Sequence, residues 1–362
     1  MNIKILGAGS IGNHLANASR SLGWQVYLCD IDQAALERTK KDIYPQRYGK
    51  WDNKINLCLS KDAPVGGFDI IIIGTPPDVH LKLAETALNE KPKAILVEKP
   101  FTTPDRTGVK VFYQKANDLG IKIFVGYDHV VGKATEFTEK KLKSKKFGKV
   151  NFIDVSFREH WGGIFKAHPW LSGPSDTYLG FWSRGGGSIG EHSHGINLWQ
   201  HFSHCVGGGR VKSVYSDITY VKNNELNYDE SAHLIFETEN GLKGRLVQDT
   251  LTTPPIKEAI IGCEKGNIIW RSCGHKGYDE VSIDTLNEDE NCYNKVVKTR
   301  PEDFILELEH ISRFINSKET SPLELSRVLE TVNIISAAHL SAEKGKKIDI
   351  DYSSDMITPN LI

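Results

Sequence analysis

The sequence has no apolar run that approaches the roughly 18 residues of a membrane-spanning helix. Its six cysteines are scattered without a CxxC pair, which argues against a zinc ribbon and against a disulfide framework. Lys and Arg (45) nearly balance Asp and Glu (46), so no net field would attract nucleic acid or an anionic membrane. We therefore expect a cytoplasmic protein with reduced thiols, and the strand at the very start of the sequence predicts no signal peptide.

The stretch 2–32 follows the order strand, glycine turn, helix, strand, acid. Gly7, Gly9 and Gly12 form a G-x-G-x-x-G turn after the first apolar run. The first glycine permits a sharp turn, the second permits close approach of a pyrophosphate, and the third permits close packing of helix on strand. Asp30 ends the second strand, where a carboxylate accepts hydrogen bonds from ribose hydroxyls and repels a 2′-phosphate. The stretch predicts a dinucleotide site that prefers NAD(H) to NADP(H), and the alternative is a glycine-rich helix start that binds nothing.

Strands and helices alternate as far as residue 127. Buried strands are expected at 70–73, 94–97 and 121–126. One helix is expected after Asp78, which can cap it, with apolar positions from Leu81 to Leu88, and another at 104–117. A shorter helix at 33–41 precedes a loop with Tyr44, Tyr48 and Trp51. This alternation predicts an α/β Rossmann domain, a doubly wound parallel sheet, over residues 1–127.

From residue 128 onward, strands follow one another without helices between them. We expect strands at 150–158, 211–220, 232–238, 242–248, 259–263 and 267–271, helices at 303–316 and 323–343, and a strand or extended tail at 348–362. Asn-Gly at 240–241 and Lys-Gly at 265–266 fit hairpin turns. The pattern predicts an α+β domain over 128–362 with a large, mostly antiparallel open sheet, whose C-terminal helix 323–344 packs back near the first domain.

Three turns are expected at the carboxyl edge of the parallel sheet: the glycine turn, residues 74–77, and Glu98-Lys99-Pro100. Ligands of open α/β sheets bind at this edge, so Lys99 is expected beside the nicotinamide. A lysine next to an oxidised nicotinamide and shielded from water releases its proton more readily, and it can polarise a substrate oxygen. An exposed turn lysine without a chemical role is the alternative. The expected cofactor contacts are Gly7, Gly9, Ser10, Ile11, Gly12, Asp30, Ile31, Thr75, Pro76, His80, Glu98 and Lys99.

A second glycine-rich stretch, 184–199, leads into a predicted helix. Four of its side chains share one face by three- and four-residue spacing: Glu191, His194, Leu198 and His201. Histidine titrates near neutrality, so His194 can take the proton of an alcohol while hydride leaves its carbon, and Glu191 can orient the imidazole. Histidines that only cap the helix or fill its buried face are the alternative.

The histidines of this stretch also raise the question of a metal. They are His192, His194, His201 and His204. The spacing puts His192 and His194 on different faces of the helix, and the stretch has no HExxH motif, so we expect no metal site.

Several motifs together resemble the Gfo/Idh/MocA family, the relatives of glucose-fructose oxidoreductase and inositol dehydrogenase. They are Gly7-Ala8-Gly9-Ser10-Ile11-Gly12, Glu98-Lys99-Pro100, Val125-Gly126-Tyr127, and a triple glycine before His194-Gly195-Ile196-Asn197-Leu198. The resemblance implies an NAD(P)-dependent sugar or cyclitol dehydrogenase with a Rossmann domain and a mixed-sheet substrate domain. It also implies a homodimer or homotetramer built through the open sheet face. The family's lysine matches Lys99, and its catalytic histidine matches His194.

Two departures from the family pattern bear on the site. The family often has an aspartate four residues before the histidine, where this chain has Gly190, and the acidic Glu191 stands one position later. Arginine and phenylalanine often follow the Val-Gly-Tyr stretch, whereas this chain has Asp128-His129. We expect the second departure to change the substrate pocket.

The segment 158–184 is rich in aromatic residues and has an arginine at each end. Flat rings suit the apolar face of a pyranose, and Arg158 and Arg184 can hold a carboxylate or phosphate, which suggests an acidic or nucleotide-linked sugar. The alternative is an oligomer contact or a domain lid. The expected substrate contacts are Lys99, Tyr127, Arg158, Trp161, Arg184 and His194.

The sequence therefore predicts reversible oxidation of a secondary hydroxyl on a sugar, sugar derivative or cyclitol, with Lys99, His194 and Glu191 as the catalytic residues. Two other functions stay open. Some relatives retain NAD and use a transient oxidation to cleave a glycosidic bond, and a non-catalytic NAD sensor or scaffold would need no reaction at all.

Overall fold

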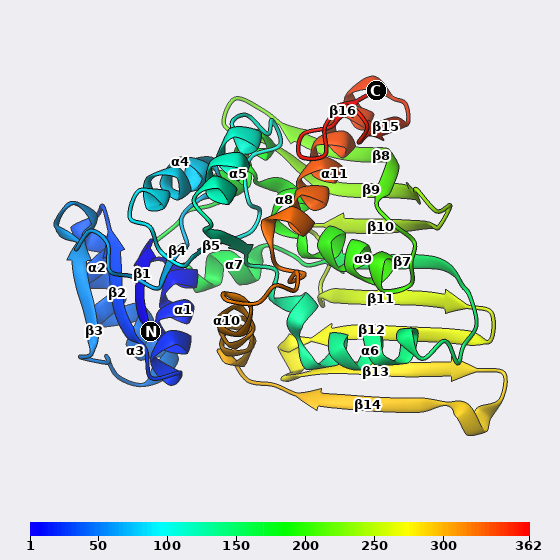
Figure 1. Ribbon diagram of the computed structural model, residues 1–362, viewed down its shortest axis with the longest axis horizontal. Helices are drawn as coiled ribbons and strands as arrows, with labels where there is room; N and C mark the ends of the chain where they lie inside the picture. The colour runs from blue at the N-terminus through cyan, green and yellow to red at the C-terminus, as the bar shows by residue number, and fades with distance from the viewer. Residues whose placement is uncertain (169) are drawn as a thin grey trace. The chain divides into compact units, whose positions relative to one another are not determined.

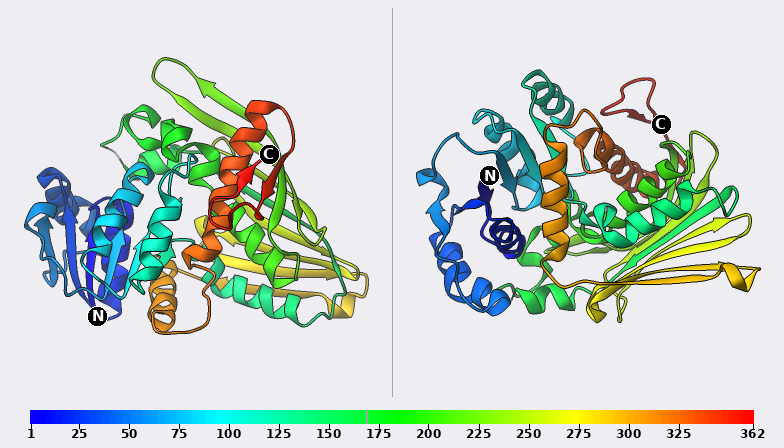
Figure 2. Two further views of the ribbon diagram at one scale, coloured as in Figure 1. Left: turned by 45° about the horizontal axis from the view of Figure 1, so that its top comes forward. Right: turned by 60° about the horizontal axis from the view of Figure 1, so that its bottom comes forward.

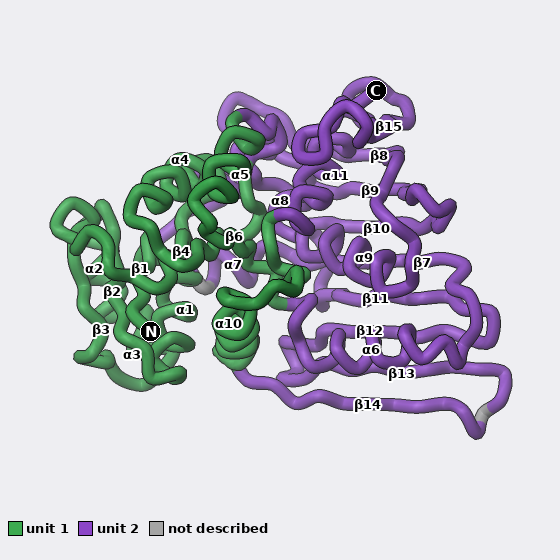
Figure 3. The backbone as a smooth tube through the Cα atoms, viewed as in Figure 1, with its two compact units in different colours: residues 1–102, 108–128, 300–325 green, residues 103–107, 129–299, 326–362 purple. Residues whose placement is uncertain are grey.

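The computed structural model describes residues 1–168 and 170–362, which form two compact units (Figure 3). The first unit contains residues 1–102, 108–128 and 300–325. The second contains residues 103–107, 129–299 and 326–362. The chain therefore changes from one unit to the other several times and ends in the second. Each unit is described by itself below.

The first unit is built on a parallel sheet that has, among the described residues, six strands in the order β3-β2-β1-β4-β5-β6. The strands are β1 Asn2–Leu6, β2 Gln25–Asp30, β3 Ile55–Leu59, β4 Ile70–Ile73, β5 Ala94–Val97 and β6 Lys122–Val125. The helices are α1 Ser10–Ser21, α2 Gln33–Arg38, α3 Tyr44–Tyr48, α4 Pro77–Leu88, α5 Val109–Asp118 and α10 Glu302–Phe314. This is the doubly wound order of dinucleotide-binding sheets, and it confirms the predicted Rossmann fold.

The core of this unit explains why its strands are apolar throughout. All four isoleucines of β4 are fully buried, because helices cover both faces of a parallel sheet. A helix from far along the sequence, α10, packs against α1. Its Phe304 stacks on His14 of α1, with 5.1 Å between the ring centroids. Burial lowers the pKa of His14 to about 3, so this histidine is a neutral core side chain.

Two predicted elements of the first unit need correction. The loop expected to hold Tyr44 and Tyr48 is helical: a π-helical turn over Thr39–Ile43 runs from α2 into α3. The side chains of Tyr44 and Tyr48 pack edge-on against each other, a contact that the sequence pattern does not predict. The helix expected from residue 104 begins only at Val109, because Gly108 has φ +82° and interrupts the pattern.

The second unit is built on a long sheet whose ten strands in the described part of the chain follow the order β14-β13-β12-β11-β7-β10-β9-β8-β15-β16 (Figure 1). The strands are β7 Val150–Arg158, β8 Val211–Lys222, β9 Asn227–Thr238, β10 Lys243–Asp249, β11 Ile256–Cys263, β12 Gly266–Cys273, β13 Tyr278–Thr285, β14 Cys292–Val297, β15 Ile348–Asp351 and β16 Asn360–Leu361. The pairing of β7 with β10 is parallel, and the other pairings of the described strands are antiparallel. The predicted mostly antiparallel sheet is confirmed.

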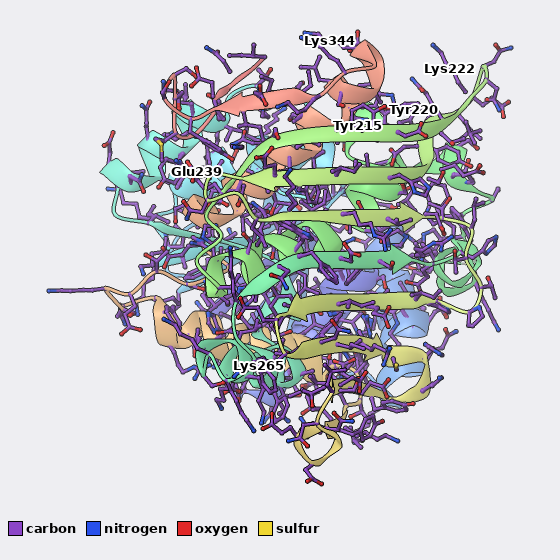
Figure 4. The ribbon with its side chains drawn as sticks, turned by 90° about the vertical axis from the view of Figure 1, so that its right-hand side faces the viewer. Tyr215, Tyr220, Lys222, Glu239, Lys265 and Lys344 are labelled. Atoms are coloured by element: carbon purple, nitrogen blue, oxygen red, sulfur yellow. The ribbon has the colours of Figure 1, made fainter. Side chains whose placement is uncertain are left out.

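The helices of the second unit cover one face of this sheet (Figure 2). They are α6 Lys133–Lys143, α7 Gly162–Ala167, α8 Gly187–Glu191, α9 His194–Cys205 and α11 Leu325–Lys344. Trp199 of α9 is buried and donates a hydrogen bond to the carbonyl of Ile153 on β7 (2.8 Å), which fixes α9 on the sheet. The opposite face carries exposed side chains such as Tyr215 of β8 (Figure 4). None of the helices in the described part of the chain has the length and apolar character that a membrane crossing requires.

Candidate active site

The glycine turn between β1 and α1 has the shape that a pyrophosphate requires. Gly7 has φ +106°, and a Cβ atom there would lie 2.6 Å from the carbonyl oxygen of Gly74. A Cβ atom on Gly12 would lie 1.9 Å from the carbonyl oxygen of Gly7. Around Gly9, in contrast, a Cβ atom would meet no described protein atom within 4 Å. Two glycines therefore allow close packing within the turn, and Gly9 borders open space at the N-terminus of α1, where Ser10 and Ile11 begin the helix.

The acid at the end of β2 is held against this turn. The backbone N–H of Ala8 donates to Asp30 Oδ2 (2.7 Å), and the N–H of Asp32 donates to Asp30 Oδ1 (2.9 Å). Each carboxylate oxygen keeps capacity for a further hydrogen bond, as two ribose hydroxyls would need. Ile31 beside it is 89% exposed, which suits a flat adenine ring.

A third residue next to the glycine turn is a cation that the sequence analysis missed. Arg47 of α3 donates to the carbonyl (2.9 Å) and the hydroxyl (2.8 Å) of Ser10. This contact places a guanidinium at the N-terminus of α1, where it adds to the positive end of the helix dipole. The sequence did not single out Arg47, because residues 44–48 show no clear helical pattern that would place it beside the glycine turn.

The turn after β4 presents a polar group without a partner. Thr75 Oγ1 is buried and has no hydrogen-bond partner among the described residues. Pro76 follows it and caps α4. The ring nitrogens of His80 lie 2.6 Å from the carbonyl oxygen of Thr75 and 3.0 Å from that of Pro100. His80 is fully buried, which lowers its pKa, so we assign it to tying two turns together rather than to touching a cofactor.

The turn after β5 exposes one side chain of the Glu98-Lys99-Pro100 motif. Glu98 and Pro100 are buried, whereas Lys99 is half-exposed at the carboxyl edge of the sheet. The carboxylate of Glu98 packs against Gly126, where a Cβ atom would lie 2.8 Å from Glu98 Oε1. The glutamate that follows β5 therefore packs closely on the glycine that follows β6, which brings two of the sequence motifs together in space.

Glu307 of α10 is a second acid in this region that the sequence analysis missed. Its carboxyl group is buried, and neither oxygen has a hydrogen-bond partner among the described residues. Burial, and then the nearby charges of Glu98 and Asp128, raise the pKa of Glu307 well above its usual value. Glu307 is thus a buried acid near Glu98 whose charged form is disfavoured. It lies some 200 residues from Lys99 in the sequence, and no local sequence pattern indicates it.

His194 begins a helix in the second unit. The single helix predicted to carry Glu191 and His194 is wrong: α8 ends at Glu191, and α9 begins at His194 after a turn at His192 and Ser193. The hydroxyl of Tyr178 donates to Glu191 Oε2 (3.1 Å). Glu191 and His194 therefore lie on two different helices separated by a turn, and not on one face of a single helix.

Asp229 of β9 fixes the start of α8. Its Oδ2 atom accepts hydrogen bonds from the hydroxyl of Ser188 (2.7 Å) and from the N–H of Ile189 (2.6 Å). A Cβ atom on Gly187 would lie 1.8 Å from Asp229 Oδ1, so only glycine fits there. Burial raises the pKa of Asp229 to about 7. The buried acid thus sets the position of the segment that leads to His194.

His129 is the ring that packs against His194. The two imidazole centroids are 4.8 Å apart with an angle of 83° between the planes. His129 in turn contacts the rings of Phe157 and Trp270 edge-on, so the sheet supports it. The chain therefore places a second histidine beside His194, at a position where the family pattern often has phenylalanine.

Three of the predicted substrate residues have other partners or are buried. Arg158 Nε donates to Asp249 Oδ2 (2.6 Å), so a carboxylate already neutralises its charge. Trp161 is only 6% exposed and packs on Tyr228, with 4.7 Å between centroids, and Tyr127 is fully buried. Arg184 lies over the ring of Phe181 at 5.6 Å.

The residues of the first unit fit a dinucleotide. They combine open space at Gly9, a carboxylate at the end of β2, and a buried hydroxyl on Thr75 that has no described partner. Residues 1–127 match the model of an oxidoreductase family with an NAD-binding Rossmann fold, and residues 138–269 match that of the GFO/IDH/MocA C-terminal domain. The chain belongs to the Gfo/Idh/MocA family. The resemblance predicted from the sequence is confirmed, and this Gfo/Idh/MocA chain is an NAD-binding oxidoreductase.

Solved structures share the fold of this Gfo/Idh/MocA oxidoreductase at low sequence identity. The WlbA dehydrogenase from Bordetella pertussis, in complex with NADH and UDP-GlcNAcA, is 17% identical with a TM-score of 0.71, over 96% of this chain and 98% of that one. Levoglucosan dehydrogenase, in complex with NADH and levoglucosan, is 15% identical with a TM-score of 0.74 over the same shares. An oxidoreductase from Desulfitobacterium hafniense, described as NADPH-dependent, is 16% identical with a TM-score of 0.74, over 96% and 97%. No curated protein sequence matches the chain significantly.

Proposed function

We propose that this oxidoreductase is an NAD(H)-dependent dehydrogenase that interconverts a secondary hydroxyl and a ketone on a sugar, sugar derivative or cyclitol. The observation that carries the proposal is an intact dinucleotide cradle next to a half-exposed Lys99 in the turn after β5. His194 at the start of α9 is the candidate base from the second unit. Both residues occupy the positions that the family resemblance assigns to chemistry.

The proposed division of labour follows from the chemistry of the two side chains. NAD⁺, when bound, supplies the hydride acceptor at its nicotinamide ring. Lys99 would donate a hydrogen bond to the reacting oxygen and stabilise the alkoxide that develops there. His194 would take the hydroxyl proton. Glu191 at the end of α8, and His129 packed edge-on against the imidazole, would hold His194 in one orientation.

For the substrate, we propose an acidic or nucleotide-linked sugar. Arg184 supports this assignment, because its guanidinium lies 5.6 Å from the ring of Phe181, so that a cation and an aromatic ring stand side by side. A guanidinium next to an aromatic ring can hold a carboxylate or phosphate while the ring contacts the apolar face of a sugar. The likeness to a dehydrogenase solved with UDP-GlcNAcA supports the same class.

The test is a panel of candidate substrates scored by the absorbance of NADH. The panel contains free hexoses, inositols, uronic acids and UDP-linked uronic acids, each mixed with the protein and NAD⁺. We expect NADH to form with members of the last two groups. Release of an aglycone without net NADH would instead identify a glycoside hydrolase. NAD binding without any turnover across the panel would favour a sensor or scaffold.

Asp30 provides the test of the cofactor preference. We propose that NAD(H) is preferred over NADP(H), because the carboxylate held by Ala8 would face a 2′-phosphate of the same charge. Replacing Asp30 by Ala should raise the NADP/NAD ratio of kcat/KM at least about tenfold, which corresponds to about 1.4 kcal/mol. Asp32→Ala, which removes only the cap of α2, is the matched control. An unchanged ratio in the Asp30 variant would contradict the assignment.

We also propose a cytoplasmic location, which the six free thiols support.

We propose that the chain forms a homodimer or homotetramer through the open face of the ten-stranded sheet. Tyr215 of β8 lies on that face (Figure 4). Its cross-strand partner on β9 is Ile235, and the two side chains are 44% and 56% exposed. We expect light scattering to give a mass of two or four chains, and Ile235→Lys to shift that mass toward one chain because it places a charge on the interface. A wild-type mass of one chain would contradict the proposal.

A further inference from the structure

Three metal-ligating side chains of the second unit converge between α6 and α9. His201 Nε2 lies 2.8 Å from Glu139 Oε1 and 3.8 Å from Cys205 Sγ. The ligand atoms of the three residues all lie within 4.8 Å of one another. Glu139 comes from α6, and His201 and Cys205 lie one turn apart on α9. We propose that Glu139, His201 and Cys205 form a binding site for a borderline-soft divalent cation, with Zn²⁺ as the preferred ion.

The arrangement differs from a catalytic relay of thiol, imidazole and carboxylate. A relay needs the carboxylate at one ring nitrogen of the histidine and the thiol at the other, so that a proton can pass through the ring. Here Glu139 and Cys205 both approach the same atom, Nε2 of His201. Convergence on one point is the arrangement that a coordinated ion requires.

Two of the three separations between ligand atoms are close to those of a tetrahedral zinc site, and the third is at most 4.8 Å. Typical zinc bond lengths give separations of roughly 3.3 Å between nitrogen and oxygen ligands and roughly 3.5 Å between nitrogen and sulfur ligands. The observed distances of 2.8 Å and 3.8 Å differ from these by about half an ångström or less. Small rotations of two side chains would therefore complete three coordination bonds, with water in the fourth position.

The donor set selects the class of ion. Imidazole and thiolate favour Zn²⁺ and similar ions over Mg²⁺ and Ca²⁺, which prefer oxygen ligands only. Lys143 holds the other carboxylate oxygen of Glu139 (2.5 Å) and thereby leaves Oε1 directed toward His201. The side chain of Lys143 is 60% exposed, so it can move away from an incoming cation.

The neighbouring histidine of α9 is engaged elsewhere. His204 Nε2 lies 2.8 Å from Glu330 Oε2 of α11. The proposed site therefore contains one of the four histidines in this region, His201. Its other two ligands, Cys205 and Glu139, are not part of that histidine pattern. A bound ion would join α6 to α9, the helix whose first residue is His194.

Cobalt provides the direct test, because Co²⁺ coordinated by a thiolate gives a sulfur-to-metal charge-transfer band. Untagged protein is treated with a chelator, desalted and titrated with Co²⁺ and then with Zn²⁺ under reducing conditions. We expect one Co²⁺ per chain with a thiolate band, and displacement of that band by one equivalent of Zn²⁺. The Cys205→Ser and His201→Gln variants should each weaken binding at least about 100-fold, more than loss of an outer-shell partner costs.

Cys58→Ser is the matched control, because Cys58 and Cys29 lie on neighbouring strands of the first unit, with their sulfurs 3.3 Å apart, and could bind cobalt independently of the proposed site. The cobalt band should persist in this variant and vanish in the Cys205 variant. Circular dichroism and thermal unfolding establish that each variant is folded. Absence of a thiolate band in the wild-type protein, or an equal band in the folded Cys205 variant, would overturn the proposal.

Discussion

Replacing Lys99 by Met should lower kcat for sugar oxidation by about 10²- to 10⁴-fold while NADH still binds. Methionine fills a similar volume but cannot donate a hydrogen bond to an oxygen on which charge develops. The interaction is strongest in the transition state, so its loss should reduce kcat rather than raise KM. Stopped-flow absorbance measures the hydride step, and fluorescence titration measures the affinity for NADH.

Lys82→Met is the control for this variant. Lys82 is an exposed lysine on α4 of the same unit, so its replacement removes a charge without touching the Lys99 turn. We expect wild-type turnover from the control. A Lys99 variant with wild-type kcat would remove the lysine from the mechanism.

Replacing Gly9 by Ala should weaken NADH binding at least about tenfold, or about 1.4 kcal/mol, without unfolding the protein. The added methyl group meets no described protein atom within 4 Å, and Gly9 has φ −79°, which any residue can adopt. We therefore expect the free energy of unfolding to change by about 0.5 kcal/mol or less, as at an ordinary surface position. The methyl group would instead meet the pyrophosphate. Fluorescence titration with NADH and thermal unfolding give the two quantities.

Two other glycines test the specificity of that result. Gly12→Ala puts a Cβ atom 1.9 Å from the carbonyl of Gly7, so it should lose stability together with NADH binding. Gly163→Ala on α7 also adds a methyl group to open space, but in the second unit, and it should leave NADH affinity unchanged. If Gly9→Ala bound NADH as tightly as the wild type, the pyrophosphate would not pass over this turn.

The fold was predictable from the sequence where the pattern of side chains and the geometry of the backbone both allow only a few residue types. The isoleucines of β4 and the glycine turn are such cases, because complete burial and a close backbone approach leave few alternatives. Three strands were missed: β3, β13 and β14. β3 is a half-exposed edge strand, β14 has no buried residue, and β13 places the charged Asp279 on its buried side, where Lys298 pairs with it at 2.8 Å. Their apolar patterns are therefore too weak to indicate strands without the tertiary pairing.

The site was predictable where its residues lie in short motifs. Lys99, Asp30 and His194 stand at the ends of strands or the start of a helix, so local pattern was enough to single them out. Asp229, Glu307, Arg47 and His129 act through partners that are distant in the sequence or outside any motif. The same limit explains why Arg158 and Trp161 looked available for substrate: the pairing with Asp249 and the packing on Tyr228 arise only in the folded second unit.

In the proposed mechanism, Lys99 and His194 act on the same hydroxyl group during hydride transfer. A double-mutant cycle tests this on the single-turnover rate with NAD⁺ and the best substrate of the panel, using Lys99→Met, His194→Asn and the double variant. We predict that each single change slows the step about 10²- to 10⁴-fold, and that the double variant is no more than about tenfold slower than the worse single one. If the double variant were slowed by the product of the two single effects, the two side chains would act independently, which would contradict the proposed mechanism. A single variant that transfers hydride at the wild-type rate would also contradict it.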